Sequence, residues 1–260
     1  MTATPLPPSS RPARRLARPD GGAIAYHKSE GGAPTVVFLT GLRSDMTGGK
    51  ALALEAHCQR RGQGFLRFDY RGHGESSGYF EDCVISDWLE DTLAVLDALS
   101  EGPLLLVGSS LGGWLMLRAA TARPARVKGL VGIAAAADFT EELMWKRLAE
   151  DERARLMRDG VVHLLSPYND EPTTVTRALI EDGRKHLLLS APIAFSGPVR
   201  LIHGLADADV PFETSFRIAM RLATSDVEIV LVKGGGHRLS EPADLARLTR
   251  IVADLSDELA

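Results

Sequence analysis

The fold of this chain is decided by one stretch, residues 104–117, which reads LLLVGSSLGGWLML. It begins as an apolar run, turns at glycines placed two residues before and two residues after Ser110, and continues with helical spacing. Such a strand–turn–helix junction forces its central residue into a strained backbone conformation that tolerates only very small neighbours. The pattern predicts that Ser110 projects at the top of a sheet, beside a helix N-terminus. An ordinary Gly/Ser-rich turn is the alternative.

Two downstream segments supply groups that would activate a serine. A serine hydroxyl is a poor nucleophile unless an imidazole accepts its proton and a carboxylate orients the imidazole. The buried run 199–202 leads into a loop with Asp207 and Asp209, and the run 227–232 leads to His237. Both loops follow the carboxyl end of a predicted strand, where open α/β sheets bind ligands. The order Ser, acid, His is the one that accompanies this type of turn, and it argues against the alternative.

These residues have distinct expected roles. We predict Ser110 as the nucleophile, since Ser109 does not occupy the middle of the Gly-x-Ser-x-Gly pattern. His237 is expected to act as general base and then as general acid. Asp207 lies nearer the strand end and is the expected orienting carboxylate, whereas Asp209 leads into Val210-Pro211. The spacing alone separates these two acids poorly, so Asp209 stays open as a rival.

An acyl-transfer site also needs backbone N–H groups that hold the oxyanion. One is expected from the residue after the nucleophile, Leu111, and the other from the loop after the predicted strand 36–39. That loop reads Thr40-Gly41-Leu42, which points to Leu42. Chemistry of this kind needs no cofactor and no metal, and no pair of histidines has the spacing of metal ligands. We expect His203 to shape the acid loop and His73 to be structural.

The composition describes an ordinary globular chain. Of the 260 residues, 45% are hydrophobic and 25% are charged, and the net charge is −4. No basic face indicates a nucleic-acid partner, and no apolar run approaches the roughly 18 residues of a membrane span. The two cysteines, Cys58 and Cys83, are expected to be reduced thiols, because a disulfide framework needs more cysteines and a secretory signal.

Strand and helix signals alternate along most of the chain. This alternation predicts an α/β protein with a mostly parallel twisted sheet and helices on both faces. Residues of about 139–196 interrupt it with a charged segment of mostly helical character, expected to include a helix from Arg177 to Leu189. An insertion at this place would lie over the carboxyl ends of the strands, and we interpret it as a helical lid that shapes an acyl or aromatic pocket. A peripheral helical hairpin is the alternative.

The N-terminal segment 1–19 is rich in proline, serine and arginine and has no apolar signal-peptide core. Its prolines oppose an amphipathic helix, so we expect a disordered tail in preference to an organelle transit peptide. The remaining residues, 20–260, are expected to form a single domain that includes the lid. A cytoplasmic location is the corresponding expectation.

The chain resembles serine hydrolases of the α/β-hydrolase superfamily, and within it a family of mitochondrial palmitoyl-protein thioesterases that also cleave acyl glucuronides. The resemblance spans roughly residues 20–250, and its most specific part is the turn at residues 108–117. The matching segments are Lys50–Glu55, Arg67–Tyr70, Gly108–Leu117, His203-Gly204, Asp207, Val210-Pro211, Ser225–Val227 and His237-Arg238.

This resemblance implies a triad of Ser110, Asp207 and His237. It also implies hydrolysis of a carboxylic ester or thioester, with a small-molecule or acylated-protein substrate. We expect no long presequence, so the mitochondrial location of that family is not carried over to this chain. The lid determines substrate choice most strongly, and there the match is weakest.

Two other functions remain compatible with the pattern. A carbon–carbon bond hydrolase or a cofactor-free perhydrolase would use the same triad on the same fold. A non-catalytic ligand-binding protein would use the pocket alone, although such proteins often lack a triad member and here each is present. The sequence leaves the physiological substrate and the oligomeric state open.

Overall fold

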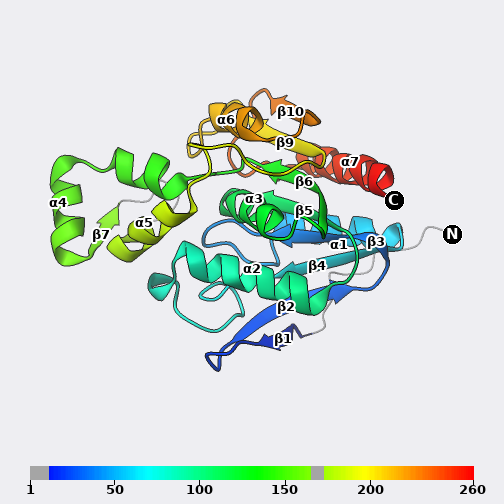
Figure 1. Cartoon of the computed structure of the whole chain (residues 1–260), viewed down its shortest axis with the longest axis horizontal. Helices are drawn as coiled ribbons and strands as arrows, with labels where there is room; N and C mark the ends of the chain where they lie inside the picture. The colour runs from blue at the N-terminus through cyan, green and yellow to red at the C-terminus, as the bar shows by residue number, and fades with distance from the viewer. Residues whose placement is uncertain (1–11, 165–172) are drawn as a thin grey trace.

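The centre of the molecule is an eight-stranded sheet, seen in a computed structural model that describes residues 12–164 and 173–260 (Figure 1). The strand order is β1-β2-β4-β3-β5-β6-β9-β10. The strands are β1 (Arg14–Ala17), β2 (Ala23–Ser29), β3 (Gly32–Leu39), β4 (Gln63–Phe68), β5 (Leu104–Ser109), β6 (Val127–Ile133), β9 (Val199–Gly204) and β10 (Val227–Val232).

Six of these strands, from β4 to β10, run parallel, and β1 and β2 are antiparallel at one edge. The central strand β5 pairs with β3 on one side and β6 on the other, and all six of its residues are buried. A parallel strand covered on both faces is expected to be apolar almost throughout, which explains the run 104–107. The predicted sheet is confirmed, and its carboxyl ends meet at the edge where Ser110 follows β5.

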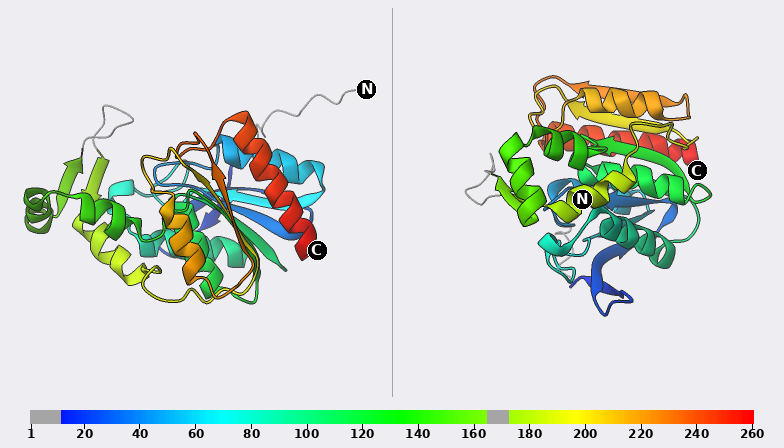
Figure 2. Two further views of the ribbon diagram at one scale, coloured as in Figure 1. Left: turned by 90° about the horizontal axis from the view of Figure 1, so that it is seen from above. Right: turned by 60° about the vertical axis from the view of Figure 1, so that its left-hand side comes forward.

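Helices cover the sheet on both faces (Figure 2). On one face α1 (Gly49–Arg60) packs beside α7 (Pro242–Leu259), and their apolar residues share a core with the outward side chains of β3, β5 and β6. On the other face lie α2 (Ile85–Leu99), α3 (Leu111–Ala122) and α6 (Glu213–Arg221), which enclose the larger core. A short 3₁₀ helix, η1 (Phe80–Asp82), precedes α2.

The predicted insertion lies between β6 and β9 and projects away from both chain ends (Figure 1). It has its own apolar cluster of five buried residues, Leu148, Leu156, Val162, Val175 and Ile180. Its elements are a π-helical turn η2 (Thr140–Met144), η3 (Trp145–Arg147), α4 (Glu150–Asp159), β7 (Val161–Leu164), β8 (Thr173–Thr176), α5 (Arg177–Gly183) and η4 (Arg184–His186).

The prediction that this insertion is mostly helical is incomplete, because β7 and β8 form a two-stranded antiparallel sheet. Each strand has only four residues, which is too short for an alternating pattern to stand out. The last helical turn ends at His186, so the predicted helix 177–189 is three residues too long. Polar contacts join the insertion to the main body: the Asp182 carboxylate accepts from the Ser86 N–H at 2.7 Å, and the Trp114 indole N–H donates to the His186 carbonyl at 3.1 Å.

The N-terminal prediction needs a correction as well. Residues Arg14–Ala17 were expected in a disordered tail, but they form β1, which pairs with β2 through a turn at Asp20-Gly21. Pairing with a neighbouring strand orders a segment whose own sequence is too polar to predict a strand. Residues 1–11 lie outside the described part. Cys58 and Cys83 are both buried and free, and within the described ranges no helix is long and apolar enough to cross a membrane.

One buried ion pair joins β4 to α1. The Arg67 guanidinium lies 2.9 Å from the Glu55 carboxylate, and both side chains are almost completely buried. Arg67 also donates to the Met46 carbonyl at 2.9 Å, in the loop that follows β3. Removing one partner of a buried pair leaves an uncompensated charge in a medium of low dielectric constant.

We therefore expect Glu55→Gln to lower the free energy of unfolding by about 3–5 kcal/mol. Urea denaturation measures this change. Glu30→Gln is the matched control, because Glu30 pairs with Lys28 at 2.9 Å while remaining largely exposed, and exposed pairs contribute about 0–1 kcal/mol. Equal effects of the two substitutions would contradict the prediction.

Candidate active site

Ser110 occupies the sharp turn between β5 and α3. Its φ of 54° and ψ of −117° are rare for a residue with a side chain and store backbone strain. Three hydrogen bonds hold this conformation: the Ser110 N–H donates to the Ile133 carbonyl at 2.9 Å, and its carbonyl accepts from Gly113 at 2.9 Å and from Ala136 at 3.0 Å. The end of β6 thus supports the turn at the end of β5.

The glycines around Ser110 are required by close backbone approach. A Cβ atom on Gly108 would collide with the Gly112 carbonyl, and one on Gly112 would collide with the carbonyls of Leu39 and Thr40. The first turn of α3 therefore packs directly against the ends of β3 and β5, with no room for a side chain. This contact explains the small residues on both sides of the serine.

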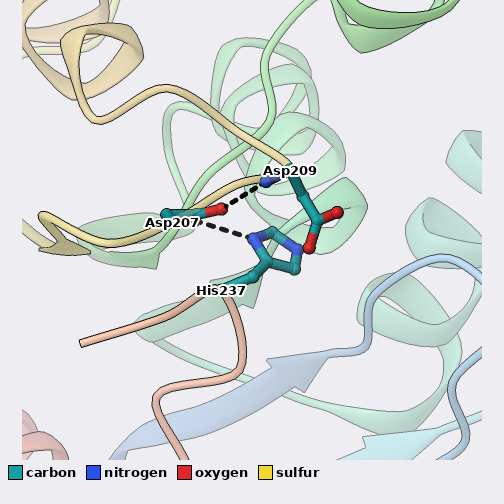
Figure 3. Close-up of side chains that lie close together, drawn as sticks. All are labelled: Asp207, Asp209 and His237. Atoms are coloured by element: carbon teal, nitrogen blue, oxygen red, sulfur yellow. Dashed lines mark hydrogen bonds and ion pairs between the residues drawn. The ribbon is translucent and has the colours of Figure 1, made fainter. Parts of the chain in front are cut away.

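Ser110, His237 and Asp207 form one chain of hydrogen bonds. His237 Nε2 lies 3.0 Å from Ser110 Oγ, and His237 Nδ1 lies 2.8 Å from Asp207 Oδ2 (Figure 3 shows the latter). A carboxylate only accepts, so Nδ1 carries the proton and the lone pair of Nε2 faces the serine hydroxyl. This arrangement brings together groups that are 30 and 127 residues apart in the sequence.

The Asp207 side chain is completely buried and accepts from several donors. Its Oδ1 accepts from the N–H groups of Asp209 and Val210, both at 2.9 Å, and Oδ2 lies 3.2 Å from His203 Nε2. Burial by itself would raise the pKa of Asp207, but the hydrogen bonds from His203, His237 and Val210 outweigh burial and hold the pKa well below its usual range. Asp207 is therefore anionic at neutral pH.

Asp209, the rival acid, takes a different position. Its backbone N–H donates to Asp207, and Figure 3 shows its carboxylate beside the His237 ring, while the hydrogen bond of His237 runs to Asp207. Oxygen and nitrogen atoms of Asp207, Asp209 and His237 lie within 4.8 Å of one another, which is the one grouping in residues 12–164 and 173–260 with the proximity of metal ligands. The hydrogen bond from His237 to Asp207 accounts for the proximity of those two side chains.

The two predicted oxyanion donors belong to the start of α3 and to the loop after β3. Leu111 is buried and begins α3 immediately after Ser110. Leu42 belongs to a turn closed by a hydrogen bond from the Ser44 N–H to the Gly41 carbonyl at 3.1 Å. That turn approaches the nucleophile closely, because a Cβ atom added to Gly41 would lie 3.4 Å from the Cβ of Ser110.

Three residues near the site have contacts that the motifs do not reveal. His203 is fully buried, with Nδ1 2.7 Å from Ser215 Oγ and Nε2 3.0 Å from the Val210 carbonyl, so it braces the loop of Asp207. Lys50 of α1 donates through Nζ to the Arg238 carbonyl, next to His237, and burial lowers its pKa to about 8. His73 contacts the turn of Leu42. In the sequence, the one signal for this role of His73 was its position in a loop that follows a predicted strand.

With this geometry established, the family of the chain follows from comparison with known proteins. The alpha/beta hydrolase family matches residues 36–248. The chain belongs to this family, and it is a hydrolase, as its sequence predicted.

Comparison with individual proteins shows which members of the family this chain resembles. The bovine (Bos taurus) palmitoyl-protein thioesterase ABHD10, mitochondrial, is 41% identical over 246 residues, which cover 94% of this chain and 80% of the relative. The structure of alpha/beta hydrolase domain-containing protein 10 from mouse superposes with a TM-score of 0.90 at 40% identity, over 95% of this chain and 99% of that one. A putative hydrolase from Agrobacterium vitis superposes with a TM-score of 0.89, also at 40% identity, over 95% and 100%. The resemblance to palmitoyl-protein thioesterases is confirmed.

The close packing at the serine turn predicts a strong effect of one added methyl group. Gly112→Ala would press a Cβ atom against two carbonyls at the end of β3, so we expect a loss of about 1–3 kcal/mol in unfolding free energy or more. Gly49→Ala is the matched control, because no atom lies within 4 Å of the added Cβ at the start of α1. Chemical denaturation of both variants makes the test, and a Gly112→Ala protein as stable as the control would count against the packing argument.

Proposed function

We propose that this chain is a serine hydrolase of carboxylic thioesters and esters that forms an acyl-enzyme on Ser110. Its proposed substrates are S-acylated proteins or acyl glucuronides. The observation that carries the proposal is the hydrogen-bonded chain from Asp207 through His237 to Ser110 at the strained turn after β5. Membership of the alpha/beta hydrolase family supports ester or thioester hydrolysis, and the similarity to palmitoyl-protein thioesterases supports the acylated substrate.

In the acylation step, Ser110 Oγ attacks the acyl carbonyl while His237 Nε2 accepts the hydroxyl proton. The imidazolium that forms is stabilised by the adjacent Asp207 carboxylate, which is anionic because its pKa is lowered. The C–S or C–O bond then breaks, and His237 returns the proton to the departing thiolate or alkoxide. The acyl group remains on Ser110.

Negative charge develops on the carbonyl oxygen during the attack. We assign its stabilisation to the backbone N–H groups of Leu111 and Leu42. In the part of the chain that the structure describes, neither N–H donates to another protein group. Preorganised donors of this kind each contribute on the order of 10²–10³ in rate. Water activated by His237 then hydrolyses the acyl-enzyme and regenerates the free serine.

The insertion between β6 and β9 is the proposed lid. It begins with Thr140, only a few residues after Ala136, whose N–H donates to the Ser110 carbonyl. Leu143 and Met144 in its first turn are partly exposed and pack on the main core, so they offer apolar surface where the insertion begins. An acyl chain would find its contacts there, and this placement supports the preference for acylated substrates.

The cellular compartment belongs to the same proposal. A cytoplasmic location stays a prediction, and the bovine relative is described as mitochondrial. The substrate is the only partner that the proposal requires.

The assignment of the orienting acid is tested by substituting both candidates. Asp207→Asn removes the charge that stabilises the imidazolium and favours the wrong tautomer of His237, so we expect kcat to fall on the order of 10⁴-fold. Asp209→Asn is the matched control, with an expected loss below about tenfold, because the hydrogen bond of His237 runs to Asp207. Steady-state kinetics on a thioester measure both. A larger loss in Asp209→Asn would reverse the assignment.

The reaction class is tested with matched acyl thioesters and oxygen esters of short and long chain length. We expect turnover of long-chain thioesters, and we expect Ser110→Ala to reduce it by more than about 10³-fold because the nucleophile is lost. A folded protein that cleaves only short oxygen esters would leave a general carboxylesterase. Cleavage of vinylogous diketones without ester turnover would instead indicate a carbon–carbon bond hydrolase.

A further inference from the structure

The turn that carries Leu42 has an unfavourable residue at its third position. The Ser44 N–H closes the turn on the Gly41 carbonyl, and of these four described residues only Arg43 has a positive φ, at 54°. This is the pattern of a type II turn, in which the third position favours glycine or asparagine. An arginine there is disfavoured, so a contact outside the turn must hold its backbone in place.

His73 makes that contact. The Arg43 N–H donates to His73 Nε2 at 3.1 Å, and His73 Nδ1 donates to the Arg71 carbonyl at 3.2 Å. The two bonds require the neutral imidazole with its proton on Nδ1, because an N–H group on Nε2 cannot accept. Burial lowers the pKa of His73, which favours this neutral form.

The ring of His73 is held on several sides. It is 4% exposed and lies with its centre 5.3–5.6 Å from the rings of Tyr70, Phe80 and Trp88. Edge-to-face contacts at such distances fix the ring plane. Nε2 is therefore a preorganised acceptor, and the loop after β4 presents it to the loop after β3.

Neighbours of His73 hold the rest of the same loop. The Tyr70 hydroxyl donates to the Thr40 carbonyl at 3.3 Å, and the Asp69 carboxylate accepts from the Met46 N–H at 2.6 Å. These bonds fix the two ends of residues 40–46, whereas the bond to His73 acts on its middle. Since Gly41 lies so close to Ser110 that an added Cβ would meet its side chain, the position of the middle of the loop affects the site where the carbonyl reacts.

We propose that His73 is a positioning residue for the oxyanion hole: by accepting the Arg43 N–H it holds the turn 41–44 so that the Leu42 N–H faces the developing oxyanion. This inference rests on the proposed function, since it presumes acyl transfer at Ser110. His73 itself touches no reacting atom. Its substitution should therefore weaken binding of the transition state and leave substrate binding largely intact.

The first experiment compares two substitutions of His73. His73→Leu removes the acceptor. We expect kcat for a thioester to fall by about 10–100-fold, which is part of the loss expected when one oxyanion donor is removed. KM should change by less than about threefold. His73→Gln places an amide oxygen near the position of Nε2 and should recover most of kcat. Equal losses in the two variants, or a loss confined to KM, would overturn the proposal.

The second experiment relieves the strain at Arg43 instead. In the His73→Leu background, Arg43→Asn supplies a residue that tolerates positive φ and should restore kcat at least fivefold. Arg43→Ala is the matched control and should restore nothing. Both remove the guanidinium, which lies 4.1 Å from the centre of the Phe80 ring and 3.1 Å from Glu81. Equal rescue by both would assign the effect to the arginine side chain and overturn the role of His73.

A readout independent of catalysis separates this inference from the proposed function. Hydrogen exchange at the Arg43 amide should accelerate in His73→Leu and return toward the wild-type rate in His73→Gln, under conditions in which both variants remain folded. Unchanged exchange in His73→Leu would overturn the positioning role. If the variants exchange as expected but the wild-type protein hydrolyses no ester or thioester, the proposed function alone is refuted.

Discussion

The strained backbone of Ser110 is the constraint on which the surrounding structure depends. A side chain at φ 54° and ψ −117° persists only where neighbours over-determine it, and here the end of β6 supplies two of the three hydrogen bonds that do so. The same turn brings Gly112 against β3, so three adjacent parallel strands converge on one residue. Glycines at 108 and 112 follow from this convergence, as does the close approach of Gly41 to the nucleophile.

Buried aspartates shape the loops that leave the carboxyl ends of these strands. Asp69 accepts from Met46 and Glu75 after β4, Asp138 accepts from Leu188 and Leu189 after β6, and Asp207 accepts from Asp209 and Val210 after β9. A carboxylate satisfies several N–H groups in places where the strand ladder has ended.

These aspartates differ in the groups that they contact, and this difference distinguishes the two structural carboxylates from the one in the proposed triad. Asp69 and Asp138 accept from backbone amides, and burial raises the pKa of both, to about 6 for Asp69. Asp207 also contacts the imidazoles of His203 and His237, and its pKa is lowered despite burial. A low pKa is what an orienting carboxylate requires, because it must stay charged while the imidazole gains a proton.

The sequence by itself determined the strands with long apolar runs, the turn at Ser110, and the order of serine, acid and histidine, since these depend on local periodicity and on glycine spacing. It did not reveal β1, the antiparallel pair β7–β8 or α6, because four-residue strands and a short helix are too short to show a clear periodicity and owe their order to the elements they pair with or pack against. Only the tertiary structure decided that His237 bonds to Asp207, and that His73 reaches the turn of Leu42. Side chains two residues apart share a sequence context, and the packing of loops from different strands sets which one accepts the hydrogen bond of His237 Nδ1.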